Sequence, residues 1–221
     1  NASDDNVIIG KNAAFGGAGT IEDCVIIGAN AMDDTDAHAN TGASENNVFV
    51  GFHSGGGTWA ATQTDNAIGI GAYALYGALD NVDGTVAIGG NALTALTSGA
   101  KNIAIGFDAM GDITQGTNNI AIGYESMNAL VGEQDVDTNS SGHSNVAIGT
   151  DSMGSVETGT HQLAACDGNI AIGTNALLGG DFVDTDKNLD YNIAIGYAAL
   201  SGTAANAQEG TIAIGKSALA A

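Results

Sequence analysis

The chain has 221 residues, of which 25 are acidic and only 4 are basic, so its formal net charge is −21. This charge argues strongly against a nucleic-acid partner, because contacts with phosphates need Lys and Arg side chains, and it disfavours docking on an anionic membrane. The chain contains 34 Gly, no Pro and two Cys, and no apolar run reaches the ~20 residues of a membrane span. We therefore expect no membrane insertion by this segment and no disulfide framework.

One motif recurs along the whole chain. It reads Asn, β-branched, small, Ile, Gly, two variable residues, then Ala or Ser, as in residues 102–109. The position before the Gly and the position three before it are always Ile or Val, and the position three after it is always Ala or Ser. A motif that recurs in this way along the whole chain predicts a repeat architecture. The eleven motif glycines are Gly10, Gly28, Gly51, Gly71, Gly89, Gly106, Gly123, Gly149, Gly173, Gly196 and Gly215.

Each motif predicts one short strand, because β-branched and small residues alternate with a period of two. In chain order these strands are expected at 7–9, 25–27, 48–50, 68–70, 86–88, 103–105, 120–122, 146–148, 170–172, 193–195 and 212–214. A three-residue strand buries little by itself, so the copies must stack into a parallel sheet. The Gly predicts a bend that has no room for a Cβ atom or needs a positive φ, and the Asn predicts an internal ladder of amides. The expected fold is all-β, a single parallel β-solenoid of eleven coils spanning residues 1–221.

The middle position of the strand is apolar in every repeat, which predicts that both faces of the sheet are covered. We expect the β-branched residues to fill the interior of the coil and the small middle residues to lie against another chain. On this interpretation the interface of a homo-oligomer contains Ala87, Ala104, Ala121, Ala147, Ala171, Ala194 and Ala213. The alternative is that inserted loops of the same chain cover this face.

Between the motifs lie acidic segments of variable length, which are expected to be loops on one side of the solenoid. In three of them, 34–40, 135–141 and 184–190, oxygen ligands alternate as at the start of a calcium loop. The best candidate site for Ca²⁺ consists of Asp184, Asp186, Asn188 and Asp190. This run lacks the Gly and the bidentate Glu of a complete calcium loop, so a solvated acidic loop is the alternative.

No Ser or Cys nucleophile lies in a recognisable arrangement with a His and a carboxylate, so the chain is not expected to be an enzyme. Cys24 and Cys166 are about seven coils apart, too far for an internal disulfide. The expected contact spot for a receptor or another subunit consists of Phe52, His53 and Trp59. Phe52 also shares the position after the motif Gly with three other rings, which predict either local packing or an outer aromatic strip: Phe107, Tyr124 and Tyr197.

The repeat unit Asn-Ile-Ala-Ile-Gly-x-x-Ala-Leu, from about Asn6 to Leu219, resembles the head repeats of trimeric autotransporter adhesins of the YadA type. It is similar also to repeats of phage tail fibres and of large surface proteins of aquatic bacteria. The resemblance implies a left-handed parallel β-roll, three chains side by side, and a role in attachment outside the cell, on a cell surface or a virion. The partners would be other copies of the chain and a cell-surface glycan or protein receptor.

The expected function is thus a non-enzymatic structural or adhesive fibre segment. The repeat begins near the first residue and ends near the last with no capping helix, which leaves a fragment of a longer fibre or a subunit that polymerises end to end as alternatives. A calcium- or ice-binding module is a lesser alternative.

Overall fold

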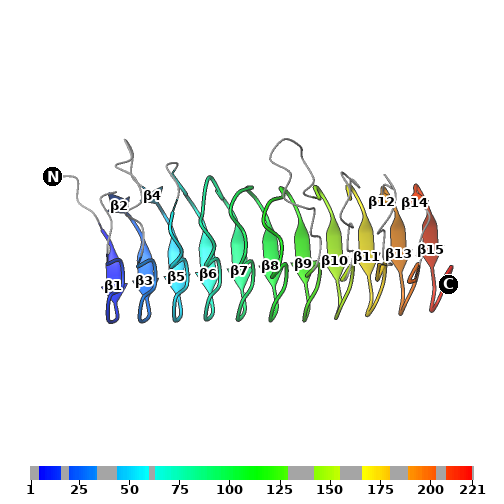
Figure 1. The fold of residues 1–221 in the computed structure, drawn as a ribbon, viewed down its shortest axis with the longest axis horizontal. Helices are drawn as coiled ribbons and strands as arrows, with labels where there is room; N and C mark the ends of the chain where they lie inside the picture. The colour runs from blue at the N-terminus through cyan, green and yellow to red at the C-terminus, as the bar shows by residue number, and fades with distance from the viewer. Residues whose placement is uncertain are drawn as a thin grey trace.

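The computed structural model describes residues 5–15, 20–33, 44–59, 63–128, 142–154, 166–179, 189–202 and 208–220. These residues form an all-β parallel solenoid that contains no helix (Figure 1). One strand from each motif joins an eleven-stranded parallel sheet whose spatial order follows the sequence. The predicted fold class and the predicted strands are therefore confirmed. The strands are β1 (Val7–Ile9), β3 (Val25–Ile27), β5 (Val48–Val50), β6 (Ile68–Ile70), β7 (Val86–Ile88), β8 (Ile103–Ile105), β9 (Ile120–Ile122), β10 (Val146–Ile148), β11 (Ile170–Ile172), β13 (Ile193–Ile195) and β15 (Ile212–Ile214).

Four shorter strands lie on the loop side of the coils and form two additional parallel pairs. β2 (Ile21–Glu22) pairs with β4 (Ser44–Glu45), and β12 (Leu189–Asp190) pairs with β14 (Gln208–Glu209). The main strands are stacked along the axis of a rod, from blue at the first coil to red at the last (Figure 1). Insertions between motifs therefore leave the register of the main sheet unchanged.

The register stacks each motif position on the same position of the next coil. Ala121 of β9, for example, lies opposite Ala104 of β8 on one side and Ala147 of β10 on the other. The hydrogen bonds run from coil to coil along the rod axis, as between the Gly123 N–H and the Ile105 carbonyl at 2.8 Å. Each coil is thus held by its two neighbours, as expected for a solenoid.

The motif Gly makes the bend after each strand possible. At all eleven positions its φ lies between 124° and 147°, a region that L side chains rarely adopt. At Gly149 an added Cβ would lie 2.7 Å from the carbonyl carbon of Gly173 on the next coil. Both reasons that the sequence suggested for the Gly are therefore confirmed.

Two further residues in each bend have a left-handed backbone, at the second and fourth positions after the Gly. In the coil of Gly106 these are Asp108, with a φ of 57°, and Met110, with a φ of 52°. The N–H of Asp108 donates to the Gly90 carbonyl and that of Met110 to the Ser126 carbonyl, so bonds to both neighbouring coils fix the conformation. Asn and Asp are frequent at the second position because they tolerate this conformation best.

The Asn at the start of the motif forms the predicted internal ladder. Asn102, Asn119, Asn145, Asn169 and Asn192 are fully buried on successive coils. The side-chain oxygen of each of the first four accepts hydrogen bonds from the backbone N–H and the Nδ2 of the next, at 2.9–3.2 Å. The ladder satisfies polar groups that would otherwise be buried without partners.

The assignment of the two strand faces was wrong. All seven Ala residues predicted to face another chain are 0–2% exposed within the single chain: Ala87, Ala104, Ala121, Ala147, Ala171, Ala194 and Ala213. They face the interior of the coil, where Ala and then Leu or Met of the bends pack in the same buried cluster, and the Ser residues that replace Ala in three bends are buried too. A coil this narrow has room for a small residue, so the β-branched residues point outward.

Phe49 shows how little space the interior offers. It occupies the middle position of β5 and is fully buried. Two neighbouring positions that hold larger residues in most other repeats are here Gly55 and Gly69, and an added Cβ on either would lie 2.6–2.8 Å from the Phe49 ring. The space for the large ring is therefore provided by two glycines of the same chain.

Candidate functional site

The outward face of the main sheet is entirely β-branched and apolar. The first and third residues of each of the eleven strands point outward, and all 22 of them are Val or Ile. Even in the middle of the rod Ile122, Ile148 and Ile172 remain 36–37% exposed. We call these 22 residues the sheet face.

The sheet face is long, narrow and uncharged. Eleven strands at about 4.8 Å spacing and three residues of about 3.3 Å each give a footprint of roughly 500 Å². A footprint of this size is comparable to the largest apolar patch on a typical monomeric protein, and such patches are often binding surfaces. A chain of net charge −21 carries no charged residue on this face, so the face can approach another apolar surface without bringing like charges together.

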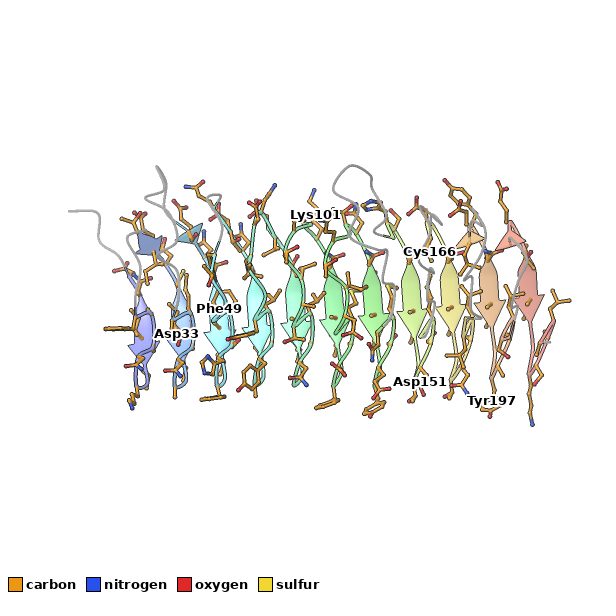
Figure 2. All side chains as sticks on the ribbon, in the orientation of Figure 1. Asp33, Phe49, Lys101, Asp151, Cys166 and Tyr197 are labelled. Atoms are coloured by element: carbon orange, nitrogen blue, oxygen red, sulfur yellow. The ribbon has the colours of Figure 1, made fainter. Side chains whose placement is uncertain are left out.

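The bend edge, formed by the residues that follow each motif Gly, carries aromatic side chains (Figure 2). Phe52, Tyr73 and Tyr76 are 46%, 36% and 37% exposed, and with His53 they form a cluster of four rings. The His53 and Tyr73 rings are parallel at 5.4 Å, while Phe52 and Tyr76 stand edge-on to both of them at 4.3–5.6 Å. We call these four residues the aromatic cluster.

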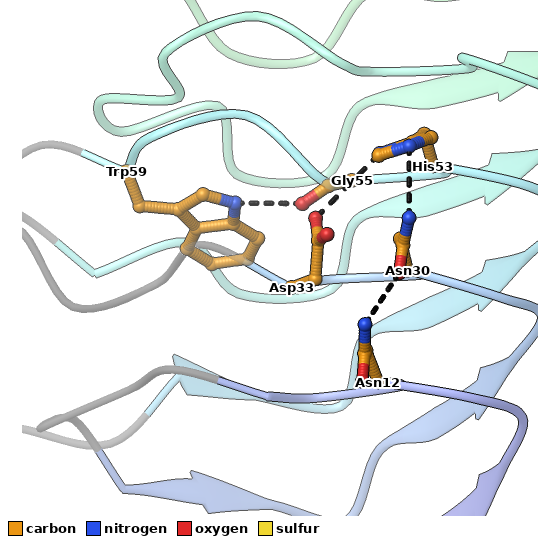
Figure 3. Close-up of polar contacts among 6 residues, drawn as sticks. All are labelled: Asn12, Asn30, Asp33, His53, Gly55 and Trp59. Atoms are coloured by element: carbon orange, nitrogen blue, oxygen red, sulfur yellow. Dashed lines mark hydrogen bonds and ion pairs between the residues drawn. The ribbon is translucent and has the colours of Figure 1, made fainter.

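His53 is held in the cluster by a chain of side-chain hydrogen bonds (Figure 3). Asn12 Nδ2 donates to Asn30 Oδ1 at 3.1 Å, and Asn30 Nδ2 donates to His53 Nε2 at 3.0 Å. Because Nε2 accepts, the neutral ring carries its proton on Nδ1, which lies 3.7 Å from Asp33 Oδ1. The ring orientation is therefore fixed by residues of two preceding coils.

The predicted contact spot is corrected at one position. Trp59 is 4% exposed, packs edge-on against Phe49 at 5.8 Å and donates from Nε1 to the Gly55 carbonyl at 2.9 Å. It is a core residue, because its ring and its N–H both find partners inside the coil. Phe52 and His53 remain at the surface. Tyr73 and Tyr76 were not predicted. Tyr73 occupies the same motif position as His53 (the second residue after the motif Gly), one repeat further along the chain; we call such a set of equivalent positions a column.

The other rings of the predicted strip are also at the surface. Phe107 and Tyr124 are stacked at 5.8 Å and about half exposed, and Tyr197 lies 5.9 Å from the Nζ of Lys216. Figure 2 shows Tyr197 and Asp151 on the bend edge and Lys101 toward the opposite edge. The strip is interrupted by small residues, so it consists of separate aromatic sites along one edge.

Carboxylates of successive coils lie close together beside these rings. Burial raises the pKa of Asp108, and repulsion from Asp112 and Glu125 raises it further. Burial also raises the pKa of Asp151, with Glu125 on the preceding coil as the next cause. The raised pKa values indicate that nearby positive charges do not balance the carboxylates of this edge.

The calcium prediction falls mostly outside the described residues. Asp184, Asp186 and Asn188 lie outside them. Asp190 is nearly buried, and its Oδ1 accepts the backbone N–H of Asp167 at 3.0 Å. Burial is the main cause that raises the Asp190 pKa. Within the described part of the chain, no group of three or more His, Cys, Asp or Glu side chains could hold a metal ion, and the Ca²⁺ site stays a prediction.

Cys24 and Cys166 are both buried, and neither of them forms a disulfide. Burial raises the pKa of both thiols, and for Cys166 the carboxylates of Asp190 and Asp167 add to the effect. Thiols held in the neutral form are poor nucleophiles. Neither cysteine is therefore equipped for covalent chemistry.

Within the described ranges, no helix is long and apolar enough to cross a membrane. Comparisons with protein-family models, with curated proteins and with solved structures found no match to this chain.

Proposed function

We propose that this chain is a non-enzymatic structural segment of an extracellular fibre that mediates attachment. Its copies associate side by side through the sheet face, and the bend and loop edges remain free for contacts with a receptor. The observation that carries the proposal is the sheet face itself, which is Val or Ile at all 22 outward positions of the eleven strands.

The size of this face suits a second copy of the same chain. Two faces of roughly 500 Å² would bury about 1,000 Å² in total, which is the lower limit for a specific interface. Two such faces also share the same strand spacing, so their ridges of β-branched side chains repeat at the same interval. Because no charged residue lies on this face, packing there brings no carboxylates into contact, which limits repulsion between chains of charge −21.

The resemblance of the repeat to trimeric adhesin heads supports three copies and a location on a cell surface or virion. A rigid rod whose coils tolerate loops of different length supports an attachment role, because such loops vary without disturbing the sheet. The proposed role depends on the shape and the surface of the rod and not on a chemical reaction.

The test is the mass of the particle in solution. The double variant Ile122→Lys, Ile148→Lys places two charges on the sheet face, where both side chains already meet solvent in the single chain. The matched control is Thr150→Lys, because Thr150 is exposed and Lys occupies the same column at Lys11 and Lys216.

We expect light scattering to give a multiple of 21.8 kDa for the unmodified chain and for the control, and 21.8 kDa for the double variant. A monomeric unmodified chain would refute association through this face. A double variant that folds and keeps the oligomer mass would refute it equally.

A further inference from the structure

The aromatic cluster has the geometry of a ligand platform rather than of core packing. Phe49 and Trp59 pack against each other in the interior of the coil, and Phe107 and Tyr124 form a stacked pair at the surface. Phe52, Tyr73 and Tyr76 expose more than a third of their surface while they contact one another or His53. We propose that this cluster binds a neutral glycan, an inference that rests on the attachment function proposed above and names its ligand.

The fold does not need these rings. The column of Phe52 holds Ala29 and Ala72 in the neighbouring coils, and the column of Tyr73 holds Asn30 and Asn91. Those coils have the same bend and the same hydrogen bonds between coils as the coil of Phe52. Packing within the solenoid therefore gives no reason for aromatic residues at these positions.

The rings are ordered before any ligand arrives. The N–H of Tyr73 donates to the Phe52 carbonyl at 2.9 Å, which fixes the two backbones relative to each other, and the two rings pack edge-on at 5.4 Å. The amide chain from Asn12 through Asn30 fixes His53, and the His53 ring lies parallel to Tyr73. A preformed surface loses little side-chain freedom on binding, which favours affinity for a small ligand.

The chemistry of the cluster favours a neutral saccharide. Exposed aromatic rings attract apolar C–H faces, and the Tyr hydroxyl groups can exchange hydrogen bonds with sugar hydroxyls. The charged side chain found at the cluster is the carboxylate of Asp33, and the whole chain carries −21, so anionic glycans, phosphates and nucleic acids are repelled. Four rings also cover far less than the ~800 Å² that a protein partner usually buries on each side.

The experiment measures binding of cellohexaose, chitohexaose and xylohexaose at millimolar concentration by calorimetry. Polygalacturonate and spermine serve as an anionic and a cationic probe. The double variant Phe52→Ala, Tyr73→Asn introduces residues that the same columns hold at Ala72 and Asn91. Asn also tolerates the left-handed φ of 58° at position 73. The matched control is Tyr124→Thr, which removes an exposed ring of the same edge outside the cluster.

We expect at least one neutral hexasaccharide to bind the unmodified chain and the control equally, and to bind the double variant about tenfold or more weakly. The proposal is overturned if no neutral probe binds, if only a charged probe binds, or if the double variant binds as well as the unmodified chain. The mass of each sample separates this result from the fibre proposal. If the chain is an oligomer that binds no neutral glycan, only the glycan proposal is refuted. If it is a monomer that binds a glycan through the cluster, only the proposed association of copies is refuted.

Discussion

Replacing Asn145 with Ala removes one rung of the buried amide ladder. The side-chain oxygen of Asn145 accepts the backbone N–H of Asn169 at 2.9 Å and its Nδ2 at 3.0 Å. The Nδ2 of Asn145 donates to the Cys166 carbonyl at 2.6 Å and to Asn119 Oδ1 at 3.2 Å. All of these groups lie inside the coil, where no solvent replaces a lost partner.

The expected loss of stability follows from the groups left behind. The variant leaves the Asn169 N–H and the Cys166 carbonyl without the side chain that each of them contacts. A buried polar group that loses its partner costs about 1–3 kcal/mol. Two such groups predict that the free energy of unfolding falls by about 2–6 kcal/mol.

Urea unfolding followed by circular dichroism measures this loss. The control is Thr150→Ala, which changes an exposed position where Ala occurs in other coils, so the free energy of unfolding should change by less than about 0.5 kcal/mol. The slope against urea should be the same for both variants if only stability changes. A loss below about 1 kcal/mol for Asn145→Ala would refute the view that the ladder satisfies buried groups.

Three further predictions concern the bends, the acidic edge and the thiols. Gly149→Ala combines a clash with the next coil and an unfavourable φ, so it should cost more than about 4 kcal/mol. Gly215→Ala shares the φ but meets nothing within 4 Å, so it should cost about 1–3 kcal/mol; equal losses in urea titrations would argue against the clash. The pKa of Asp151 is raised above 3.8 in the folded chain, so its carboxylate binds a proton at a higher pH in the folded chain than in the unfolded chain. The contribution of Asp151 to the free energy of unfolding should therefore increase as the pH falls from neutral toward 3.8. Asp151→Asn should then raise the melting temperature at pH 7 by about 1–2 °C, because removing the charge relieves its partial burial and the repulsion from Glu125 by about 0.5 kcal/mol at this largely solvated site. A lower melting temperature would contradict this sign. Cys24 and Cys166 are buried, so an aromatic disulfide reagent at pH 8 should modify neither in the native chain and both in concentrated urea; rapid reaction without urea would show that the coil opens.

The strands, the bends and the ladder could be predicted because each depends on a local pattern that repeats. Val or Ile on both sides of a small residue predicts a strand, and a Gly that recurs after every strand predicts a special φ. The Asn column predicts its own hydrogen bonds, since stacking places identical amides next to one another. None of these inferences depends on how wide the coil is.

The orientation of the sheet depends on that width, and for this reason it was predicted wrongly. Alternation shows that Ala121 and Ile122 point to opposite sides, but it does not show which side is the interior. One signal in the sequence does bear on the question. Phe49 replaces the usual Ala, and two nearby positions become Gly55 and Gly69, which is the compensation expected when all three share one packed interior.

The aromatic sites were predicted only in part. Aligning the repeats shows which side chains are neighbours on successive coils, but it does not show how deeply each side chain is buried. Phe52 and His53 follow a motif Gly, so their place at the surface could be predicted. Trp59 lies in a segment without a motif, and the tertiary contact with Phe49 that buries it leaves no signal in the repeat. Tyr73 could have been found by aligning its column with His53.

The central claim is that the sheet face of one chain is covered by the sheet faces of other copies. Electron cryomicroscopy of the purified chain tests this most directly, because it resolves how the rods are arranged in cross-section. The account predicts rods about 50 Å long, in which two or more copies turn their Val and Ile ladders toward a common axis and their acidic loops outward. Single solenoids, or assemblies in which the sheet faces meet solvent, would contradict it.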